Sequence, residues 1–332
     1  MGLLGWVKYP VVAYLFIIMA FEGRWPGTAI SGADAGLRQI LIVSDAKTGH
    51  LNQSLGLAEA LVELRPGITI AQWAPLSRMQ AWKSLISGRL PIAASKPALL
   101  IGAGHGTHLT LLALKRCWRV PAVVLMKPSL PLGLFDLCLI PEHDQPPRRD
   151  NVIPTRGALN RMRPAAKVPG SGMILIGGPA KNSGWPEARL LDQLRDLVRR
   201  DPRSWQLTTS RRTPASTLAL LQQLEGIELF PVEQTEPGWL PRQLAVTEQC
   251  WVSEDSVSMI YEALSAGCAV GAFEVPWQRK GRLFRGLKRL KQSGLLTSFS
   301  DWSGAPLSAP EEGFNEAARC AEAIVQRGWL QV

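Results

Sequence analysis

The sequence predicts an α/β protein made of two Rossmann-like, doubly wound domains that follow an N-terminal hydrophobic segment. Short apolar runs of β type alternate with longer stretches of helical period, which is typical of folds with parallel sheets. The chain has 332 residues, enough for two domains of about 150 residues each. A stretch with prolines, glycines and no apolar periodicity separates two such strand–helix series, and this indicates a linker.

Residues 1–37 form a segment of their own, because an uncharged apolar run extends from Tyr9 to Phe21. A helix over this run covers about 20 Å, less than the roughly 30 Å hydrocarbon core of a bilayer. We expect a membrane-associating segment that lies in the interface or anchors shallowly. A true span or secretory signal, and a buried segment of a globular domain, are the alternatives.

Residues 38–160 are predicted to form the first domain. Its helices are expected over residues 51–64, where apolar residues recur at helical spacing, and over residues 107–117. Its predicted strands are residues 38–45, 68–74, 97–104, 121–127 and 136–142.

Residues 161–171 are the predicted linker, and residues 172–332 are predicted to form the second domain. Two of its helices are expected over residues 185–200 and 213–224. Its predicted strands are residues 172–179, 205–212, 226–232, 244–255 and 268–276.

The formal net charge of +10 indicates a surface that attracts anions, such as acidic lipid, phosphorylated substrates or nucleic acid. Nucleic acid is the weakest of these, because no recognisable nucleic-acid-binding module accompanies the charge. The five cysteines form no CxxC pair, which favours reduced thiols over a zinc site or a disulfide framework.

Ligands of parallel sheets bind at the carboxyl ends of the strands, so the strand exits are the candidate sites. The first exit reads SDAKTGHLNQS, where Gly49 allows close backbone approach and the next helix directs its free N–H groups toward an anion. His50 is a candidate general base there, and a histidine that only caps the helix is the alternative. The other histidines also follow predicted strands of this half, in GAGHGTH (102–108) and PEHD (141–144).

In the second half, the backbone N–H groups of Gly177 and Gly178 are candidates to cradle a phosphate at a strand end. The adjacent arginines of TTSRRTP suit a phosphate or carboxylate, unless they lie on a solvated face. VSEDSVSMIYEALSAGCAV (252–270) combines residues of N-cap type with Glu262, about two turns into a helix. A carboxylate there can accept hydrogen bonds from a ribose diol while the helix N-terminus binds a diphosphate.

The segment RKGRLFRGLKRLK (279–291) is basic, has no acidic residue, and carries Leu283, Phe284, Leu287 and Leu290 at helical spacing. A basic amphipathic helix of this kind binds anionic lipid. The alternative is a solvated helix that packs on its own domain.

Four of these stretches, in this order, resemble the mitochondrial-fission regulator (elongated-mitochondria) family and its bacterial members. They are SDAKTGHLNQSLGLAEAL, PEHD followed by NVIPTRGALN, TTSRRTP, and SEDSVSMIYEALSAG. The resemblance runs from about Gln39 to Leu296 and implies the GT-B glycosyltransferase fold. The same elements look more distantly like the enzyme that makes peptidoglycan lipid II and like plastid galactolipid synthases.

Those enzymes have a Gly-His turn, matched here by Gly49-His50, and a glutamate that holds the nucleotide ribose, matched by Glu262. The resemblance implies that His50, Asp45 or Asp144 deprotonates the acceptor hydroxyl if the reaction is inverting; a retaining reaction is the open alternative. The implied donor-binding residues are Gly177, Gly178, Arg211, Arg212, Ser256, Ser258 and Glu262. The implied acceptor-binding residues are Gly49, Asn52, Gln53, His105, Glu142 and His143.

The expected function is therefore transfer of a sugar from a nucleotide-sugar to a lipid-linked or lipopolysaccharide-core acceptor. No metal and no other cofactor is expected, since these relatives work without metal and the sequence has no DxD motif. We expect the protein at the cytoplasmic face of a bacterial inner membrane, peripheral or N-terminally anchored. A non-catalytic, membrane-associated adaptor that recruits protein partners is the alternative, as the family name suggests. An epimerase or reductase would have GxGxxG directly after the first strand and a Tyr-x-x-x-Lys pair, and neither is present.

Overall fold

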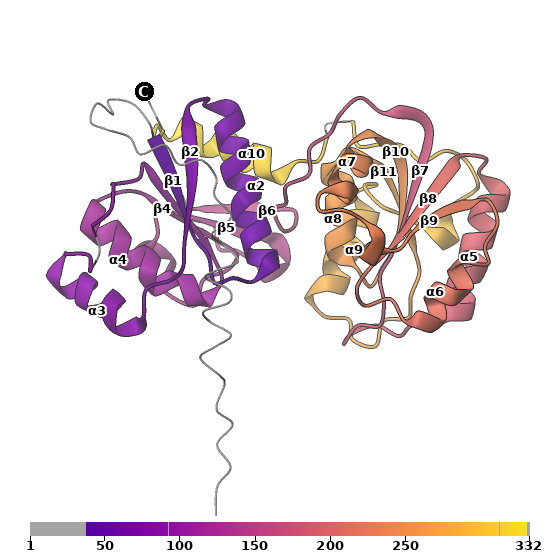
Figure 1. The fold of residues 1–332 in the computed structure, drawn as a ribbon, viewed down its shortest axis with the longest axis horizontal. Coiled ribbons are helices and arrows are strands. Elements are labelled where there is room, and N and C mark those ends of the chain that lie inside the picture. The colour runs from indigo at the N-terminus through magenta and orange to yellow at the C-terminus, as the bar shows by residue number, and fades with distance from the viewer. Residues whose placement is uncertain (1–37, 92, 312, 331–332) are drawn as a thin grey trace, which may run out of the picture. The chain divides into compact units, whose positions relative to one another are not determined.

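The computed structural model describes residues 38–330 except 92 and 312, and the predicted hydrophobic segment lies outside these residues. Two six-stranded sheets with parallel strands organise the described chain (Figure 1). The predicted fold class of two Rossmann-like domains is confirmed.

The first sheet has the strand order β2-β1-β3-β4-β5-β6. Side chains of β1 alternate between its two faces: Ile40 and Ile42 enter one core, and Leu41 and Val43 enter the other. This alternation explains why the strand reads as a continuous apolar run, since both faces of the sheet are covered. The strands are β1 (Arg38–Val43), β2 (Ile68–Trp73), β3 (Leu99–Ala103), β4 (Ala122–Leu125), β5 (Leu137–Pro141) and β6 (Val152–Thr155).

The second sheet has the order β12-β11-β10-β7-β8-β9, and its two faces likewise carry separate apolar cores. The strands are β7 (Val168–Ile176), β8 (Ser204–Thr209), β9 (Ile227–Phe230), β10 (Thr247–Ser253), β11 (Ala269–Phe273) and β12 (Thr297–Ser298).

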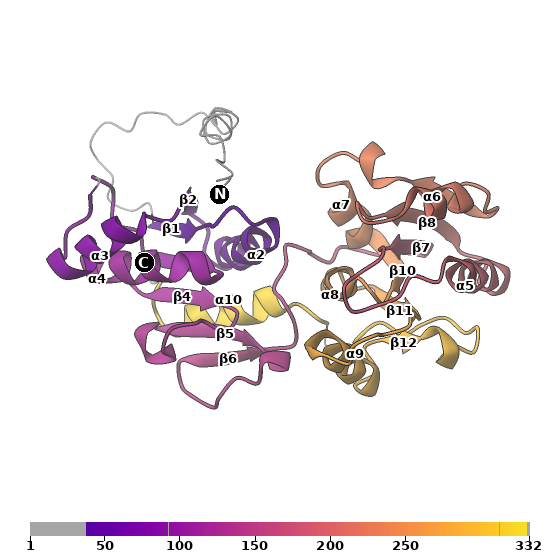
Figure 2. The ribbon, with the colours of Figure 1, turned by 90° about the horizontal axis from the view of Figure 1, so that it is seen from below.

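Helices cover both sheets (Figures 1 and 2). The helices associated with the first sheet are α2 (Thr48–Leu64), α3 (Arg78–Ser87), α4 (His108–Trp118) and α10 (Glu316–Gln326). Those of the second are α5 (Glu187–Arg200), α6 (Ala215–Leu221), α7 (Trp239–Val246), α8 (Val257–Ser265) and α9 (Arg282–Gln292). Short 3-10 turns are η1 (His105–Thr107), η2 (Leu132–Leu134), η3 (Glu142–Asp144), η4 (Val232–Gln234) and η5 (Phe299–Asp301).

The C-terminal helix α10 departs from the predicted domain division. Residues 172–332 were expected to form one domain, but Ala317, Ala321 and Ile324 of α10 are buried in the core of the first sheet. Figure 1 shows α10 next to α2. The physical reason is that the apolar stripe of α10 covers sheet surface that α2 leaves open, which no local pattern in the sequence indicates.

Two further expectations about elements were wrong. The strand predicted over residues 244–255 begins only at Thr247, because the preceding residues form the last turn of α7. The basic segment 279–291 does contain a helix, α9, but Leu287 and Leu290 are buried in the second domain. Of the two readings of this segment, the helix packed on its own domain is therefore the observed one.

The chain between the sheets lies against α2. A Cβ atom at Gly56 would stand 2.2 Å from the carbonyl oxygen of Asn160, so α2 needs a glycine where this segment crosses it. No helix among residues 38–91, 93–311 and 313–330 is long and apolar enough to cross a membrane.

Candidate active site

Several of the residues predicted from strand exits lie at the switch points of the two sheets. In the first sheet β2 lies on one side of β1, and β3 lies on the other side, followed by β4, β5 and β6. The strand order therefore reverses between β1 and β3. In the second sheet β7 and β10 are neighbours in the same way. The crevice outside the carboxyl ends of two such strands is where open α/β sheets bind ligands.

Asp45 and His50 form a hydrogen-bonded pair at the first switch point. Asp45 follows β1, and His50 lies in the first turn of α2, where Nδ1 is 2.9 and 3.0 Å from the two carboxylate oxygens of Asp45. The short loop between β1 and α2 brings the two side chains together across five positions. The two candidate bases are thus parts of one unit.

The charge of Asp45 determines which ring nitrogen of His50 is available. Burial opposes ionisation of Asp45, but the hydrogen bond and charge of His50, with help from Lys47, hold the pKa of this carboxyl below its ordinary value. An ionised carboxylate only accepts hydrogen bonds, so Nδ1 of His50 carries a proton and donates it. Nε2 is then the nitrogen that can take a proton from a substrate.

The backbone of the glycine-rich turn after β3 covers this pair. A Cβ atom at Gly104 would stand 2.4 Å from Nδ1 of His50 and 3.0 Å from Oδ2 of Asp45, and the residue has φ +85°. Any other residue at this position would displace the pair. Gly104 was not among the predicted site residues. Its position in the glycine-rich turn directly after a predicted strand could have indicated it.

Two histidines of this turn have different environments. His105 is exposed, and its ring stands edge-on to that of His108, with 5.6 Å between centroids. His108 is buried, and its Nδ1 is 3.2 Å from the hydroxyl of Ser129. Burial, with a smaller effect from His105, lowers the pKa of His108 to about 4. His108 is therefore a neutral structural residue, whereas His105 is accessible to a ligand.

The remaining predicted residues of α2 are partly accessible. A Cβ atom at Gly49 would meet no protein atom within 4 Å, so the space beside this residue is open. The amide of Gln53 donates to the Gly49 carbonyl at 3.2 Å and lies 3.8 Å from Sδ of Met126, just after β4. Asn52 is partly exposed on the same turn of the helix.

Glu142, His143 and Asp144 form a separate group at the exit of β5. Asp144 forms an ion pair with Arg282 of α9, and Glu142 lies 3.6 Å from Arg289. Burial lowers the pKa of His143; the Asp144 charge opposes this, and nearby arginines of α9 reinforce it. Within residues 38–330, no hydrogen bond or ion pair connects this group to Asp45 or His50. The structure therefore does not bring Asp144 together with the other two candidate bases.

At the second switch point, Asp255 takes the position expected for a phosphate. Its Oδ2 accepts the Gly178 N–H at 3.0 Å and a guanidinium N–H of Arg212 at 2.9 Å. The Gly177 N–H donates to the hydroxyl of Ser253 at 2.8 Å. The expectation that these two N–H groups cradle a phosphate is wrong for this structure, because side chains of the β10 exit already occupy them.

Arg212 also donates to the carbonyl oxygens of Gly178 and Pro179, at 2.6 and 3.1 Å. This arginine therefore fixes the turn after β7, while its neighbour Arg211 is exposed. Asp255 was missed as a site residue, although it stands in the motif that predicted an N-cap. Its Oδ1 is buried and has no hydrogen-bond partner among the described residues.

The N-terminus of α8 has no side-chain cap. Ser256 precedes the helix, and its side chain makes no capping bond. Ser258 is exposed in the first turn. The first N–H groups of a helix have no partner within it, so this end of α8 favours a bound anion.

Glu262 lies one turn beyond Ser258 on α8. Burial raises the pKa of its carboxyl to about 7. Within the described chain no hydrogen bond or ion pair satisfies this carboxylate. A half-buried carboxyl group without a protein partner has free acceptors for the hydroxyl groups of a ligand.

The part of the chain that the structure describes contains no group of three or more His, Cys, Asp or Glu side chains arranged to hold a metal ion.

The family model described as Mitochondrial fission ELM1 matches residues 48–328. No curated protein sequence matches the chain. Among solved structures, UDP-GlcNAc 2-epimerase from Methanocaldococcus jannaschii is similar with a TM-score of 0.51 at 10% identity, over 87% of this chain and 99% of that one. A putative UDP-N-acetylglucosamine 2-epimerase from Listeria monocytogenes has a TM-score of 0.50 at 12% identity, over 89% and 88%. At these identities the likeness shows the fold alone.

Proposed function

The chain belongs to the Mitochondrial fission ELM1 family, and from this premise we propose that it is a glycosyltransferase of GT-B fold that uses a nucleotide-sugar donor. The observation that carries the proposal is the Asp45–His50 pair at the first switch point. An imidazole oriented by a carboxylate, with its other nitrogen free, is the usual arrangement of a general base.

In the proposed reaction, Nε2 of His50 removes the proton of an acceptor hydroxyl. The acceptor oxygen then bonds to the anomeric carbon as the bond from that carbon to the diphosphate breaks, so the configuration inverts. Asp45 holds the imidazole in place and stabilises its positive charge. The N-terminus of α8 stabilises the charge on the departing nucleoside diphosphate.

The donor is proposed to lie along α8. Its diphosphate meets the uncapped helix N-terminus at Ser256 and Ser258, with the exposed Arg211 nearby in the proposed complex. Glu262 accepts hydrogen bonds from the ribose hydroxyls. Gly177, Gly178 and Arg212 form the wall of this site rather than its phosphate contacts, because their polar groups already bond to Ser253 and Asp255.

The acceptor is proposed to be a lipid-linked or lipopolysaccharide-core glycan at the cytoplasmic face of an inner membrane. The net charge of +10 and the apolar run from Tyr9 to Phe21 support a membrane location. The partly exposed residues near His50, among them Gln53 and His105, are the proposed contacts of this acceptor.

Calorimetry with UDP-, GDP-, ADP- and CMP-sugars tests the donor site. The panel includes UDP-GlcNAc, since two structures of this fold are epimerases named for that compound. We expect one donor to bind the wild type and Glu262→Ala to weaken its binding at least tenfold, about 1.4 kcal/mol. Glu225→Ala, an exposed glutamate just before β9, is the matched control and should bind like the wild type.

Failure of every donor to bind would contradict the transferase and favour the non-catalytic adaptor. Equal binding by the Glu262 and Glu225 variants would remove Glu262 from the ribose site. Conversion of a bound nucleotide-sugar to its epimer, without an acceptor, would replace the transferase by an epimerase.

A further inference from the structure

Helix α3 leaves one of its faces uncovered. Met79, Trp82 and Ile86 are 65%, 58% and 78% exposed, and they follow one another at helical spacing. Ala81 and Ser84, on the opposite face, are almost fully buried against α4. Figures 1 and 2 show α3 beside α4, at the edge of the first domain. We call the uncovered face the α3 face, defined by Met79, Trp82 and Ile86.

The part of the sequence that contains α3 carries only positively charged residues among its ionisable Asp, Glu, Lys and Arg side chains. Between Glu63 and Asp136 the sequence contains no acidic residue. The cations in this interval are Arg65, Arg78, Lys83, Arg89, Lys96, Lys115, Arg116, Arg119 and Lys127. Three of them, Arg78, Lys83 and Arg89, are exposed on α3 or just after it. An apolar stripe flanked by cations is complementary to a surface with both hydrocarbon and phosphate.

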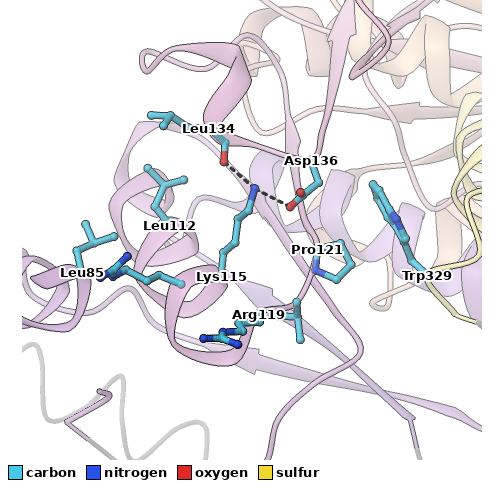
Figure 3. A pocket seen from close by; sticks show the side chains of 10 residues that line it. Leu85, Leu112, Lys115, Arg119, Pro121, Leu134, Asp136 and Trp329 are labelled. Atoms are coloured by element: carbon cyan, nitrogen blue, oxygen red, sulfur yellow. Dashed lines mark hydrogen bonds and ion pairs between the residues drawn. The ribbon is translucent and has the colours of Figure 1, made fainter. Parts of the chain in front are cut away.

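A hollow of about 660 Å³ beside α4 continues this surface. Figure 3 shows Leu85, Leu112, Leu134 and Trp329 around it, together with Lys115 and Arg119. Lys115 is held by the Leu134 carbonyl at 3.0 Å and by Asp136 at 2.9 Å. Arg116 and Arg119 are exposed, and no ion pair within the described residues engages them. The hollow thus has apolar walls, two exposed arginines, and one carboxylate, Asp136, which is paired with Lys115.

The hollow itself lies at one edge of the first sheet. Val120 and Asp136, which line it, stand just before β4 and β5, so it lies at the amino ends of the parallel strands. The chain enters β1 at Arg38, at the same edge.

Helix α9, the other amphipathic basic helix, lacks such a face. Leu287 and Leu290 are 2% and 4% exposed, and Phe284 packs edge-on to Trp277. Arg282, Arg289 and Lys291 form ion pairs with Asp144, Glu142 and Glu254. Only Leu283, 41% exposed, remains available, which makes α9 the natural comparison.

We propose that the α3 face docks onto an anionic lipid bilayer, with Met79, Trp82 and Ile86 in the interfacial layer and Arg78, Lys83 and Arg89 on lipid phosphates. A tryptophan flanked by cations is typical of residues at a membrane interface. The inference rests on the membrane location in the proposed function and is independent of the donor chemistry. It assigns the contact to α3, in the first domain, rather than to α9.

A fluorophore on α3 tests this in the full chain. The protein carries Cys117→Ser, because the other four cysteines are buried, and an NBD group on Met79→Cys or, as the matched control, on Leu283→Cys. With phosphatidylglycerol-containing vesicles we expect the emission at position 79 to shift to the blue and to be quenched by doxyl-labelled lipid. The label at position 283 should not respond, and neither label should respond to pure phosphatidylcholine.

The charge variant Arg78→Gln/Lys83→Gln/Arg89→Gln should abolish the response at position 79. The control Arg285→Gln/Lys288→Gln, two exposed cations of α9, should leave it unchanged. An aqueous label at position 79 in protein that sediments with the vesicles would overturn the proposal. So would a response at position 283 alone.

A label at position 79 that is shielded from iodide before vesicles are added would also overturn it, because the chain itself or a second copy would then cover α3. Donor calorimetry on the same labelled protein separates this result from a failure of the proposed function, since donor binding does not involve α3.

Discussion

Substitution of His50 should impair sugar transfer without impairing donor binding. His50→Ala should leave the donor dissociation constant within about twofold of wild type and lower kcat by about 10² or more, the range of a lost general base. Asp45→Asn should also lower kcat, because a neutral amide no longer holds the ring with Nδ1 protonated. Calorimetry and a radiolabelled transfer assay measure the two quantities.

Arg65→Ala, an exposed residue just after α2, is the control and should behave as wild type in both assays. If the His50 variant transferred sugar at the wild-type rate, His50 would not be the general base and would only stabilise the turn before α2. Loss of donor binding by it would place His50 in the donor site instead.

Glu262 should make stability depend on pH. Burial raises the pKa of its carboxyl to about 7 from an ordinary value of 4.5, so the folded protein binds this proton more tightly than the unfolded chain. The resulting stabilisation is full below pH 4.5 and is lost as the pH rises through about 7. Glu262→Gln should therefore raise the melting temperature relative to wild type at pH 8 and have little effect at pH 4.5.

Thermal denaturation between pH 4.5 and 8 measures this difference, with Glu225→Gln as the exposed control. A gain from Glu262→Gln that is the same at every pH would contradict a raised pKa at this position.

At the scale of single residues, the sequence predicted which residue types stand at the strand exits but not the contacts they make. Gly177 illustrates the limit. The sequence predicts a glycine that lets a phosphate approach, whereas a Cβ atom there would stand 2.1 Å from Oδ2 of Asp255. A phosphate and a carboxylate both need a residue without a Cβ atom in order to approach the backbone N–H groups. Only the structure shows that a carboxylate takes this position.

At the scale of elements, α10 should contribute to the stability of the first domain. Ile324 is fully buried among residues of the first sheet and α2, so Ile324→Ala should lower the free energy of unfolding by about 2–4 kcal/mol. Urea unfolding monitored by circular dichroism measures the change. Glu322→Ala, an exposed position on the same helix, should cost less than about 0.5 kcal/mol.

If α10 belonged to the second domain only, Ile324→Ala would leave contacts of the first core intact. Hydrogen exchange would distinguish packing of α10 on the first domain from packing on the second, since we expect the amides of α2 to lose protection in the Ile324→Ala variant. Unchanged protection of α2 would contradict the packing of α10 on it.

The two amphipathic helices α3 and α9 show how far helical periodicity predicts surroundings. The sequence around α9 has the stronger pattern of leucines and cations, yet its apolar stripe faces the second core. The weaker stripe of α3 remains uncovered. Periodicity therefore predicts that a helix has an apolar face, and the neighbouring elements decide whether protein or solvent meets it.

At the scale of the whole molecule, the sequence alone determined the class of fold and the edge where chemistry takes place. Apolar strands of about five residues alternate with helices, and parallel strands place all their exits on one edge of a sheet. These features follow from local patterns, because burial on both faces requires apolar residues throughout a strand.

Only the tertiary structure decided which of these residues meet. Gly178 and Asp255 are 77 positions apart, Gly56 of α2 lies against Asn160 in the segment between the sheets, and α10 returns to a sheet that begins at Arg38. Such contacts depend on strand order and helix packing, which have no signature within a short stretch of sequence. For the same reason the sequence predicted Asp45 and His50 as separate candidate bases, and their geometry makes them one pair.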